Sequence, residues 1–221
     1  MATPIPKNKA PFVSGELALA TGGAIVRPGT IEQFAGVTSD SRSVVAGEVF
    51  VALRGEKFDG HDHVASAAQR GAAALVVERE VDVPPSVAVL RVADSLKALG
   101  GLGRFHRQRW WARDRVRRRV VGITGSAGKT TTRHVIEQLL SFAGSRVHSS
   151  AGNLNNAIGV PMTLLGLTDD HDLAVVEMGM NQPGEIAHLA RTALPDVGVL
   201  TLVAEAHTGG VGSIEGVAQE K

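Results

Sequence analysis

A lysine and a threonine directly follow a short glycine-rich run in the second half of the chain. Residues 120–132 read VVGITGSAGKTTT. The apolar start, Val120–Thr124, predicts a buried strand, and Thr130–Ala143 predicts an amphipathic helix. Glycines allow backbone N–H groups to turn inward at a helix N-terminus, and this arrangement favours a bound phosphate. Lys129 can then reach the β- and γ-phosphates of a nucleotide, and the Thr130 hydroxyl can bind Mg²⁺.

This loop departs at one position from the general phosphate-loop pattern G-x-x-x-x-G-K-[ST]. That pattern needs glycine where this chain has Ile123, so the loop is the shorter T-G-x-x-G-K-T form. A glycine-rich turn without a ligand is the alternative. However, strand, loop, Lys-Thr pair and helix follow in the order that a nucleoside triphosphate site requires. The residues expected to bind the nucleotide are Thr124, Gly125, Ser126, Ala127, Gly128, Lys129, Thr130 and Thr131.

Carboxylates that bind a metal are expected at the ends of the strands beside this loop. Glu177 ends the apolar segment LAVVE and is the first candidate, with a surface glutamate at a strand end as the alternative. His207 follows the next predicted strand and, beside a phosphate site, becomes a candidate ligand. Glu205 adds a carboxylate close to it.

The elements that must position these residues alternate along the chain. Strands are predicted at residues 49–53, 74–77, 87–92, 120–124, 173–176 and 197–203. Helices are predicted at residues 63–70, 130–143 and 184–192. A weaker helical repeat runs from Asp94 to Phe105 and is interrupted by Gly100 and Gly101. The alternation predicts an α/β fold, in which a small α/β domain precedes a parallel-sheet domain that carries the phosphate loop.

Residues 104–119, RFHRQRWWARDRVRRR, form the one strongly basic segment and include two adjacent tryptophans. Basic and aromatic side chains can bind phosphates and stack on bases, so a nucleic-acid patch is one interpretation. The other is the solvated end of a helix followed by an interdomain linker. The chain as a whole is balanced, with 23 Lys and Arg against 22 Asp and Glu, and no nucleic-acid-binding motif accompanies the segment. We therefore expect a linker and no nucleic-acid partner.

The composition narrows the class of protein further. The chain has 221 residues, and at about 150 residues per domain this length allows about one and a half domains. Without cysteine there is no disulfide, thiolate metal site or cysteine nucleophile. The first residues lack the uninterrupted apolar core of a signal peptide, and no window reaches the roughly 18 apolar residues of a membrane span. We expect a cytoplasmic protein without a membrane partner.

Six longer segments, one of which contains the phosphate loop, indicate a relationship to a known family. They are TSDSR (38–42), GEVFVALRGEKFDGHDH (47–63), GITGSAGKTTT (122–132), GNLNNAIGVPMTLL (152–165), EMGMNQPGEIAHL (177–189) and HTGGVGSIEGVAQEK (207–221). Together they resemble the Mur ligases, the ATP-dependent amide ligases of peptidoglycan precursor synthesis. The GNLNN and MNQPGEI segments resemble the family member that adds D-alanyl-D-alanine to UDP-N-acetylmuramoyl-tripeptide. The first two segments are shared with the ligase that adds the third amino acid.

The resemblance implies a role for each matching residue. Lys129, Glu177, His207 and Lys221 are the implied catalytic residues. Thr130, Glu177, His207 and Lys221 are the implied Mg²⁺ ligands, with Lys221 carbamylated. Substrate binding is implied for Ser39, Asp40, Ser41 and Arg42 at the uridine nucleotide and for Asn153, Asn155 and Asn156 at the muramoyl peptide. For the Asp40–Arg42 pair, a surface turn with a weak ion pair is the alternative.

The implied reaction transfers the γ-phosphoryl group of ATP to the terminal carboxylate of the UDP-N-acetylmuramoyl-peptide. The amine of D-alanyl-D-alanine then attacks the acyl phosphate. Charge develops on oxygen atoms in both steps, so Mg²⁺ and Lys129 are the expected stabilisers.

The resemblance also divides the chain. Residues 1–103 match an N-terminal UDP-substrate-binding domain, 104–119 a basic linker, and 120–221 an incomplete central ATP-binding domain without the C-terminal domain that follows in the family. We therefore expect that the chain lacks ligase activity by itself. We also expect a monomer. The alternatives are the related ligase that adds the third amino acid and a non-catalytic UDP-sugar- or nucleotide-binding module.

Overall fold

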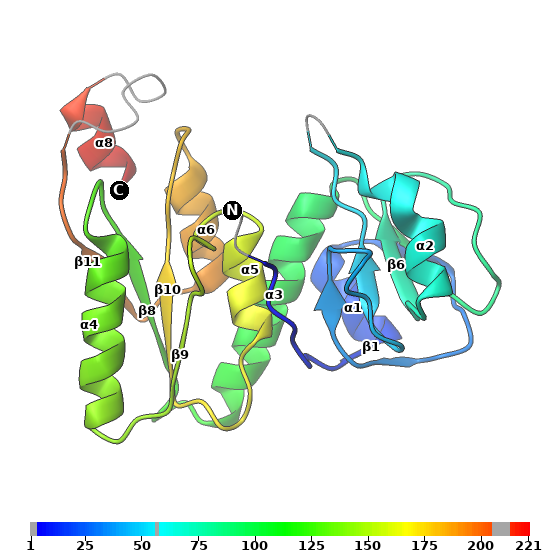
Figure 1. The fold of residues 1–221 in the computed structure, drawn as a ribbon, viewed down its shortest axis with the longest axis horizontal. Coiled ribbons are helices and arrows are strands. Elements are labelled where there is room, and N and C mark those ends of the chain that lie inside the picture. The colour runs from blue at the N-terminus through cyan, green and yellow to red at the C-terminus, as the bar shows by residue number, and fades with distance from the viewer. Residues whose placement is uncertain (1–3, 56–57, 205–212) are drawn as a thin grey trace.

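Two larger sheets, each covered by helices, lie side by side with helix α3 (Ser95–Arg113) between them (Figure 1). A computed structural model describes the chain over residues 4–55, 58–204 and 213–221. The α/β architecture predicted from the sequence is confirmed. We refer to the part before α3 as the N-terminal lobe and to the part after it as the second lobe.

The N-terminal lobe is built on a five-stranded sheet with the order β2-β7-β6-β5-β4. Its strands are β2 (Ala24–Arg27), β4 (Val37–Thr38), β5 (Val49–Val51), β6 (Ala74–Val77) and β7 (Ala88–Arg91). All neighbours are parallel except β2, which runs antiparallel to β7. The lobe is completed by α1 (Ser14–Thr21), η1 (Gly60–His63), α2 (Val64–Gln69) and the antiparallel pair β1 (Phe12–Val13) and β3 (Gln33–Phe34).

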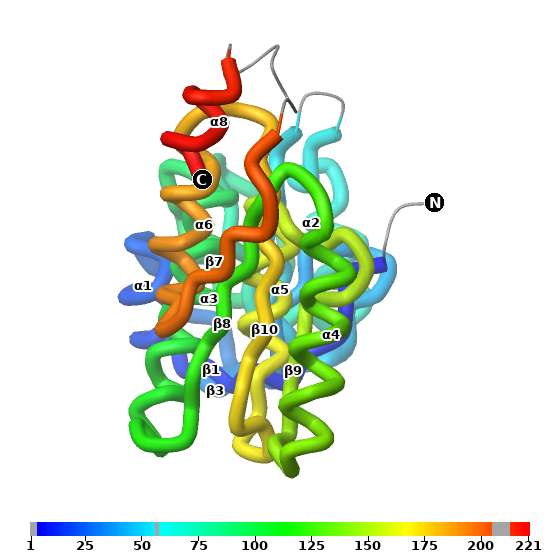
Figure 2. The backbone as a smooth tube through the Cα atoms, turned by 90° about the vertical axis from the view of Figure 1, so that its left-hand side faces the viewer, coloured from blue at the N-terminus to red at the C-terminus, as the bar shows by residue number. Residues whose placement is uncertain are grey.

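The second lobe has a four-stranded, fully parallel sheet with the order β11-β8-β10-β9. Its strands are β8 (Arg119–Thr124), β9 (Val147–Ser149), β10 (Leu173–Glu177) and β11 (Val197–Leu200). Its helices are α4 (Lys129–Phe142), α5 (Gly159–Leu165), α6 (Glu185–Ala193) and α8 (Ile214–Glu220). Helix α4 covers one face of the sheet, while α5 and α6, together with α3, cover the other (Figure 2).

Strands β8 and β10 are apolar on both faces because helices cover both sides of the sheet. Val120 and Val176 belong to the core beneath α3, α5 and α6. Ile123 and Val175, on the opposite face, are also fully buried. Glu177 pairs in register with Ile123, so the alternation of a strand directs its side chain toward α4.

Helix α3 runs through the segment that was predicted to be a basic linker. Residues 104–113 are helical, and His106, Arg107 and Trp110 are buried, so the expectation of a solvated helix end is wrong. Trp110 lies in the core of the second lobe, and Arg107 forms a 2.9 Å ion pair with Asp196.

At 19 residues α3 is long, but neither it nor any other helix within the described ranges is long and apolar enough to cross a membrane.

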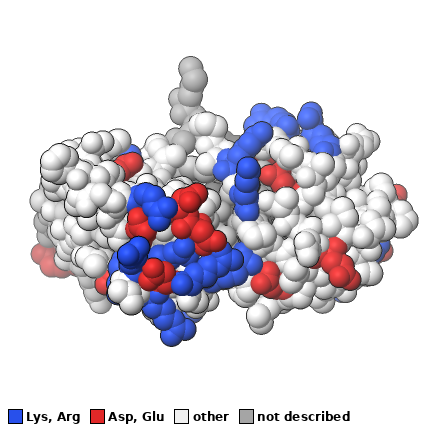
Figure 3. Space-filling model, turned by 90° about the horizontal axis from the view of Figure 1, so that it is seen from below, with Lys and Arg blue, Asp and Glu red and all other residues white. Residues whose placement is uncertain are grey.

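Two further arginines of this segment pair with one carboxylate. Arg118 pairs with Asp169 at 3.1 Å, and Arg113 pairs with the same carboxylate. The face shown in Figure 3 accordingly carries Lys and Arg side chains intermixed with Asp and Glu rather than a uniformly basic patch. Pairing within the protein accounts for these arginines.

The glycines that weakened the helix prediction are contact points for α3. A Cβ atom on Gly101 would lie 2.0 Å from the carbonyl oxygen of Ala20 in α1. A Cβ atom on Gly103 would lie 2.7 Å from the Cα atom of Pro161 in α5. Only glycine permits these close approaches, so α3 packs tightly against a helix of each lobe.

Candidate active site

The phosphate loop is formed where β8 ends at Thr124 and α4 begins at Lys129. Gly125 and Gly128 have φ angles of 150° and 80°, which residues with a side chain rarely adopt. Thr201, just after β11, fixes the loop from the neighbouring strand, because its hydroxyl donates to the carbonyl of Ala127 at 2.6 Å. The predicted sequence of strand, loop and helix is confirmed.

Two further groups of the loop have neighbours in the segment that follows β11. The Ser126 N–H donates to the carbonyl of Leu202 at 2.7 Å, and the Ser126 hydroxyl donates to the carbonyl of Ala204 at 3.0 Å. Thr131, in the first turn of α4, is exposed. The loop is therefore held by hydrogen bonds before any ligand is considered.

Two side chains at this loop have the chemistry of a phosphate site. Lys129 Nζ donates to the carbonyl of Gly125 at 2.7 Å, which holds the ammonium over the loop. The Thr124 hydroxyl is buried and has no hydrogen-bond partner in the part of the chain that the structure describes. A buried hydroxyl without a partner is destabilising, and a phosphate oxygen is the kind of partner that a ligand in this loop would bring.

Glu177, the last residue of β10, faces the first turn of α4 and is only 1% exposed. Its Oε2 accepts a hydrogen bond from the Thr130 hydroxyl at 3.2 Å. Its Oε1 accepts a hydrogen bond from Arg133 Nε at 2.8 Å. Burial rules out the alternative of a surface glutamate, and the two predicted metal ligands Thr130 and Glu177 lie next to each other.

Thr130 and Glu177 fit a magnesium ion. Mg²⁺ binds oxygen atoms octahedrally at about 2.1 Å, so neighbouring ligand oxygens lie about 3 Å apart. The 3.2 Å between Thr130 Oγ1 and Glu177 Oε2 agrees with two neighbouring positions. The described residues contain no group of three His, Asp or Glu side chains that could hold a metal, but Mg²⁺ commonly uses one or two protein oxygens together with water and substrate phosphates. His207 and Glu205 lie outside the described residues.

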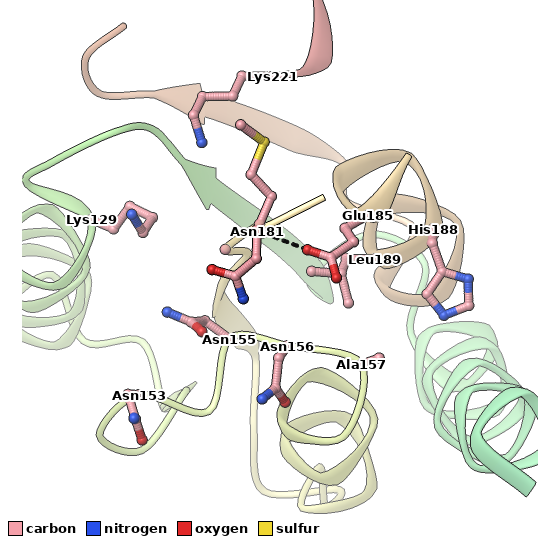
Figure 4. A pocket seen from close by; sticks show the side chains of 12 residues that line it. Lys129, Asn153, Asn155, Asn156, Ala157, Asn181, Glu185, His188, Leu189 and Lys221 are labelled. Atoms are coloured by element: carbon pink, nitrogen blue, oxygen red, sulfur yellow. Dashed lines mark hydrogen bonds between the residues drawn. The ribbon is translucent and has the colours of Figure 1, made fainter. Parts of the chain in front are cut away.

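A cavity of about 320 Å³ opens beside the phosphate loop (Figure 4). Lys129 lines it from α4, and Lys221 lines it from the residue after α8. Asn153, Asn155 and Asn156 line it from the loop before α5. The structure therefore brings residues of the predicted phosphate, metal and muramoyl-peptide sites to one cavity.

The asparagine loop is anchored on both sides of the cavity. Asn156 Oδ1 accepts hydrogen bonds from the N–H groups of Ile158 and Gly159, at 3.1 and 2.9 Å, and so binds the start of α5. The carbonyl of Asn155 accepts a hydrogen bond from the N–H of Gly179 at 2.8 Å, which ties the loop to the segment after β10.

Three further lining residues, Asn181, Glu185 and His188, carry no predicted role. Glu185 Oε2 accepts a hydrogen bond from the Asn181 N–H at 2.5 Å, which closes the turn before α6 (Figure 4). His188 lies one helical turn later on α6. These residues belong to EMGMNQPGEIAHL, but the segment alone does not indicate which of its side chains face a cavity. Arg133 was also missed, although it lies one helical turn after Thr130.

Lys221 lies where its amine is easier to deprotonate. Burial and the positive charge of Lys129 lower the pKa of the Lys221 ammonium, while Glu220 opposes them. A lowered pKa increases the fraction of neutral, nucleophilic amine.

The predicted uridine-nucleotide residues lie in the N-terminal lobe and do not line this cavity. Arg42 Nε and Nη2 donate to the two carboxylate oxygens of Asp40 at 2.9 and 2.8 Å, and these bonds lower the pKa of Asp40. The Arg42 side chain is 85% exposed, while Ser39 and Ser41 are half-buried in the same turn. Asp40 and Arg42 therefore hold an exposed turn in order, and this turn makes no contact with the phosphate loop among the described residues.

Two family models match most of the chain. The Mur ligase family catalytic domain matches residues 33–107, and the Mur ligase middle domain matches residues 123–221. Among curated relatives, the UDP-N-acetylmuramoyl-tripeptide–D-alanyl-D-alanine ligase of Escherichia coli (strain K12) is 44% identical over 185 residues. That match covers 84% of this chain but only 39% of the relative, so the chain spans less than half of the length of such ligases.

Solved structures show the same relationship. The chain is similar to MurF from Acinetobacter baumannii with a TM-score of 0.87 and 34% identity, over 99% of this chain and 46% of that one. It is also similar to the MurF ligase from Thermotoga maritima, solved in complex with ADP, with a TM-score of 0.73 and 34% identity. That match covers 84% of this chain and 41% of the other.

Proposed function

Because this chain belongs to the Mur ligase family, we propose that it carries the nucleotide-binding loop and the muramoyl-peptide loop of a UDP-N-acetylmuramoyl-tripeptide–D-alanyl-D-alanine ligase. The observation that carries the proposal is the cavity that joins Lys129 to the asparagine loop and to Lys221. A phosphoryl donor bound at the loop and a substrate carboxylate bound near the asparagines would meet there. The order of loop, metal pair and cavity along one sheet edge suits phosphoryl transfer.

In this proposal the chain's own groups hold the reactants and stabilise charge. The phosphates of ATP bind the backbone of residues 125–128, with Lys129 next to the β- and γ-phosphates. A carboxylate oxygen of the tripeptide forms a bond to the γ-phosphorus, the bond to the bridging oxygen breaks, and ADP leaves. The amine of D-alanyl-D-alanine then attacks the acyl carbon, the C–O bond to phosphate breaks, and the nitrogen releases a proton as the amide forms and phosphate leaves. Mg²⁺, held by Thr130 and Glu177 when bound, would neutralise charge on the phosphate oxygens.

Lys221 is the proposed carbamylated residue. Its neutral amine would attack CO₂, forming an N–C bond as one C=O π bond becomes a carboxylate oxygen and the nitrogen loses a proton. The product replaces an ammonium by a carboxylate that can bind a cation. The lowered pKa of Lys221 supports this reaction, since the step begins from the neutral amine.

The remaining assignments are proposals of the same kind. Ser39, Asp40, Ser41 and Arg42 would bind the uridine nucleotide in the N-terminal lobe, and His207 would bind a second Mg²⁺. A monomer in the cytoplasm is the expected state of the protein. Light scattering of the purified protein and cell fractionation would test these two expectations.

Lys129→Ala tests the nucleotide site separately from the UDP-substrate site. Calorimetry should show at least tenfold weaker ATP binding, because the variant loses the ammonium of the loop, and unchanged binding of UDP-N-acetylmuramoyl-tripeptide. The control Lys97→Ala removes an exposed lysine of α3 that pairs with Asp94, and it should change neither affinity. Equal loss of both affinities in Lys129→Ala would count against two separate sites, and unchanged ATP affinity would refute the assignment of the loop.

Phosphate release in the ligase that contains these residues tests the substrate assignment. Release should require both UDP-N-acetylmuramoyl-tripeptide and D-alanyl-D-alanine, and Lys129→Ala should abolish it. Release with UDP-N-acetylmuramoyl-dipeptide and a single amino acid would instead identify the related ligase that adds the third residue.

A further inference from the structure

Arg133 is a buried cation behind the proposed metal site. Its side chain is 6% exposed, although arginine is usually found at the surface. It donates from Nε to Glu177 Oε1 at 2.8 Å and from Nη1 to Glu137 Oε2 and Ser149 Oγ, both at 3.2 Å. The network therefore links α4, β9 and β10 beneath the phosphate loop.

The geometry at Glu177 separates its two oxygen atoms. Arg133 binds Oε1, while Oε2 points to the hydroxyl of Thr130. The Ser149 hydroxyl donates to Glu137 at 2.8 Å, so Glu137, which receives the guanidinium, is itself held. Because a guanidinium is planar with fixed donor directions, this chain of contacts leaves little freedom for the Glu177 carboxylate to rotate.

We propose that Arg133 is a positioning residue that presents Glu177 Oε2, beside the Thr130 hydroxyl, as a single-oxygen ligand for Mg²⁺. This inference rests on the proposed function, because it concerns the metal site of the same reaction. Arg133 follows Thr130 by three residues, so both side chains lie on the same face of α4. Groups that orient a metal ligand from behind commonly contribute a 10- to 100-fold increase in metal affinity.

A simple charge argument predicts the opposite result, and this makes the proposal testable. If Arg133 acted only as a nearby positive charge, its removal would leave Glu137 and Glu177 uncompensated and would strengthen cation binding. If Arg133 orients Glu177, its removal must weaken cation binding in spite of the added negative charge. The sign of the change in metal affinity therefore separates the two roles.

Arg133→Met removes the charge and all donors and keeps a long side chain. Mn²⁺ binding in the presence of ADP should be measured by electron paramagnetic resonance, and ADP binding in EDTA by calorimetry. We expect Mn²⁺ affinity to fall about 10- to 100-fold, while the ADP affinity without metal stays within about twofold. Arg133→Lys, which keeps the charge and one donor direction, should recover part of the loss.

Arg146→Met is the matched control, because Arg146 also pairs with a carboxylate, Asp172, at 3.1 Å, but lies at the surface away from the loop. It should bind Mn²⁺ as the unmodified protein does. A folded Arg133→Met variant with equal or higher Mn²⁺ affinity would overturn the proposal.

Ser149→Ala keeps the proposal testable if Arg133→Met does not fold. It removes the hydroxyl that contacts both Arg133 and Glu137 and changes no charge, so the charge argument predicts unchanged Mn²⁺ affinity. If Arg133 orients Glu177, Mn²⁺ affinity should fall several-fold; unchanged affinity would overturn the proposal. Absence of Mn²⁺ binding by the unmodified protein with ADP would refute the proposed function itself, and the role of Arg133 with it.

Discussion

Buried His106 in α3 makes the stability of the protein depend on pH. Its Nε2 lies 2.8 Å from the carbonyl oxygen of Leu167, and its Nδ1 lies 3.0 Å from Arg109 Nη2. Because a guanidinium only donates, Nδ1 must accept, so the ring proton sits on Nε2 and is donated to Leu167. A second proton on Nδ1 would face a positive charge inside the protein.

Burial, together with the charges of Arg109 and Arg113, lowers the pKa of His106 from 6.5 to about 4; the Leu167 carbonyl and Asp169 oppose this shift. The unfolded chain therefore binds a proton at His106 in a pH range where the folded protein does not. Above pH 6.5 His106 is neutral in both the folded and the unfolded state, and the protein keeps its full free energy of unfolding. This free energy decreases as the pH falls from 6.5 toward 4. With these two pKa values, the free energy of unfolding should decrease by about 2 kcal/mol between pH 7.5 and pH 5.0.

Urea unfolding followed by circular dichroism at pH 7.5 and 5.0 measures this change. His106→Gln keeps an amide donor for Leu167 and an acceptor for Arg109 but cannot be protonated, so it should lose about 2 kcal/mol less than the unmodified protein. Other titrating groups are shared by both proteins and cancel in the comparison. The control His63→Gln removes an exposed histidine and should keep the original difference. Equal pH dependence in the unmodified protein and His106→Gln would refute this account of His106.

Three further substitutions test the loop, the core and a surface pair. Gly125→Ala should abolish ATP binding in calorimetry, because its Cβ would lie 1.9 Å from Thr201 Oγ1 at a φ angle that favours glycine; unchanged affinity would mean that the loop can rearrange. Leu164→Ala should lower the free energy of unfolding by about 2–5 kcal/mol in urea, since Leu164 is fully buried; a much smaller loss would show that the core closes around the gap. Asp172→Asn removes the ion pair with Arg146 and should lower the free energy of unfolding only slightly at pH 7, as for other ion pairs at the surface. Hydrogen bonds from Arg146 lower the pKa of Asp172 to about 2, so the difference between the two proteins should vanish as the pH falls through about 2. A large loss of stability at pH 7, or a loss that stays the same at low pH, would contradict that account.

The phosphate loop could be predicted from the sequence because all of its parts are neighbours along the chain. An apolar strand, two glycines, Lys129 and Thr130 form one continuous segment, and the backbone itself makes the binding surface. The same holds for β6 and β7, because Gly71 precedes the first of these short apolar runs and Pro84 and Pro85 separate the two.

The basic segment could not be interpreted correctly from local pattern. The density of arginine in this segment suggests a solvated linker. In the structure, however, Arg107 pairs with Asp196 and Trp110 enters the core of the second lobe. Both partners lie far away in sequence, so charge and composition could not identify them. Gly101 and Gly103 likewise look like helix-weakening residues until the close approach of α1 and α5 is known.

By itself, then, the sequence determined the α/β fold and the position of the phosphate loop, and it offered a carboxylate at a strand end as a candidate metal ligand. Each of these depends on local periodicity and on the parallel order of strands. Only the tertiary structure decided which side chains meet. It placed Arg133 behind Glu177 and joined Lys129, Lys221 and the asparagine loop around one cavity. Such contacts depend on how α4, α5 and α8 pack around the sheet, and packing arises from many distant contacts that no single segment encodes.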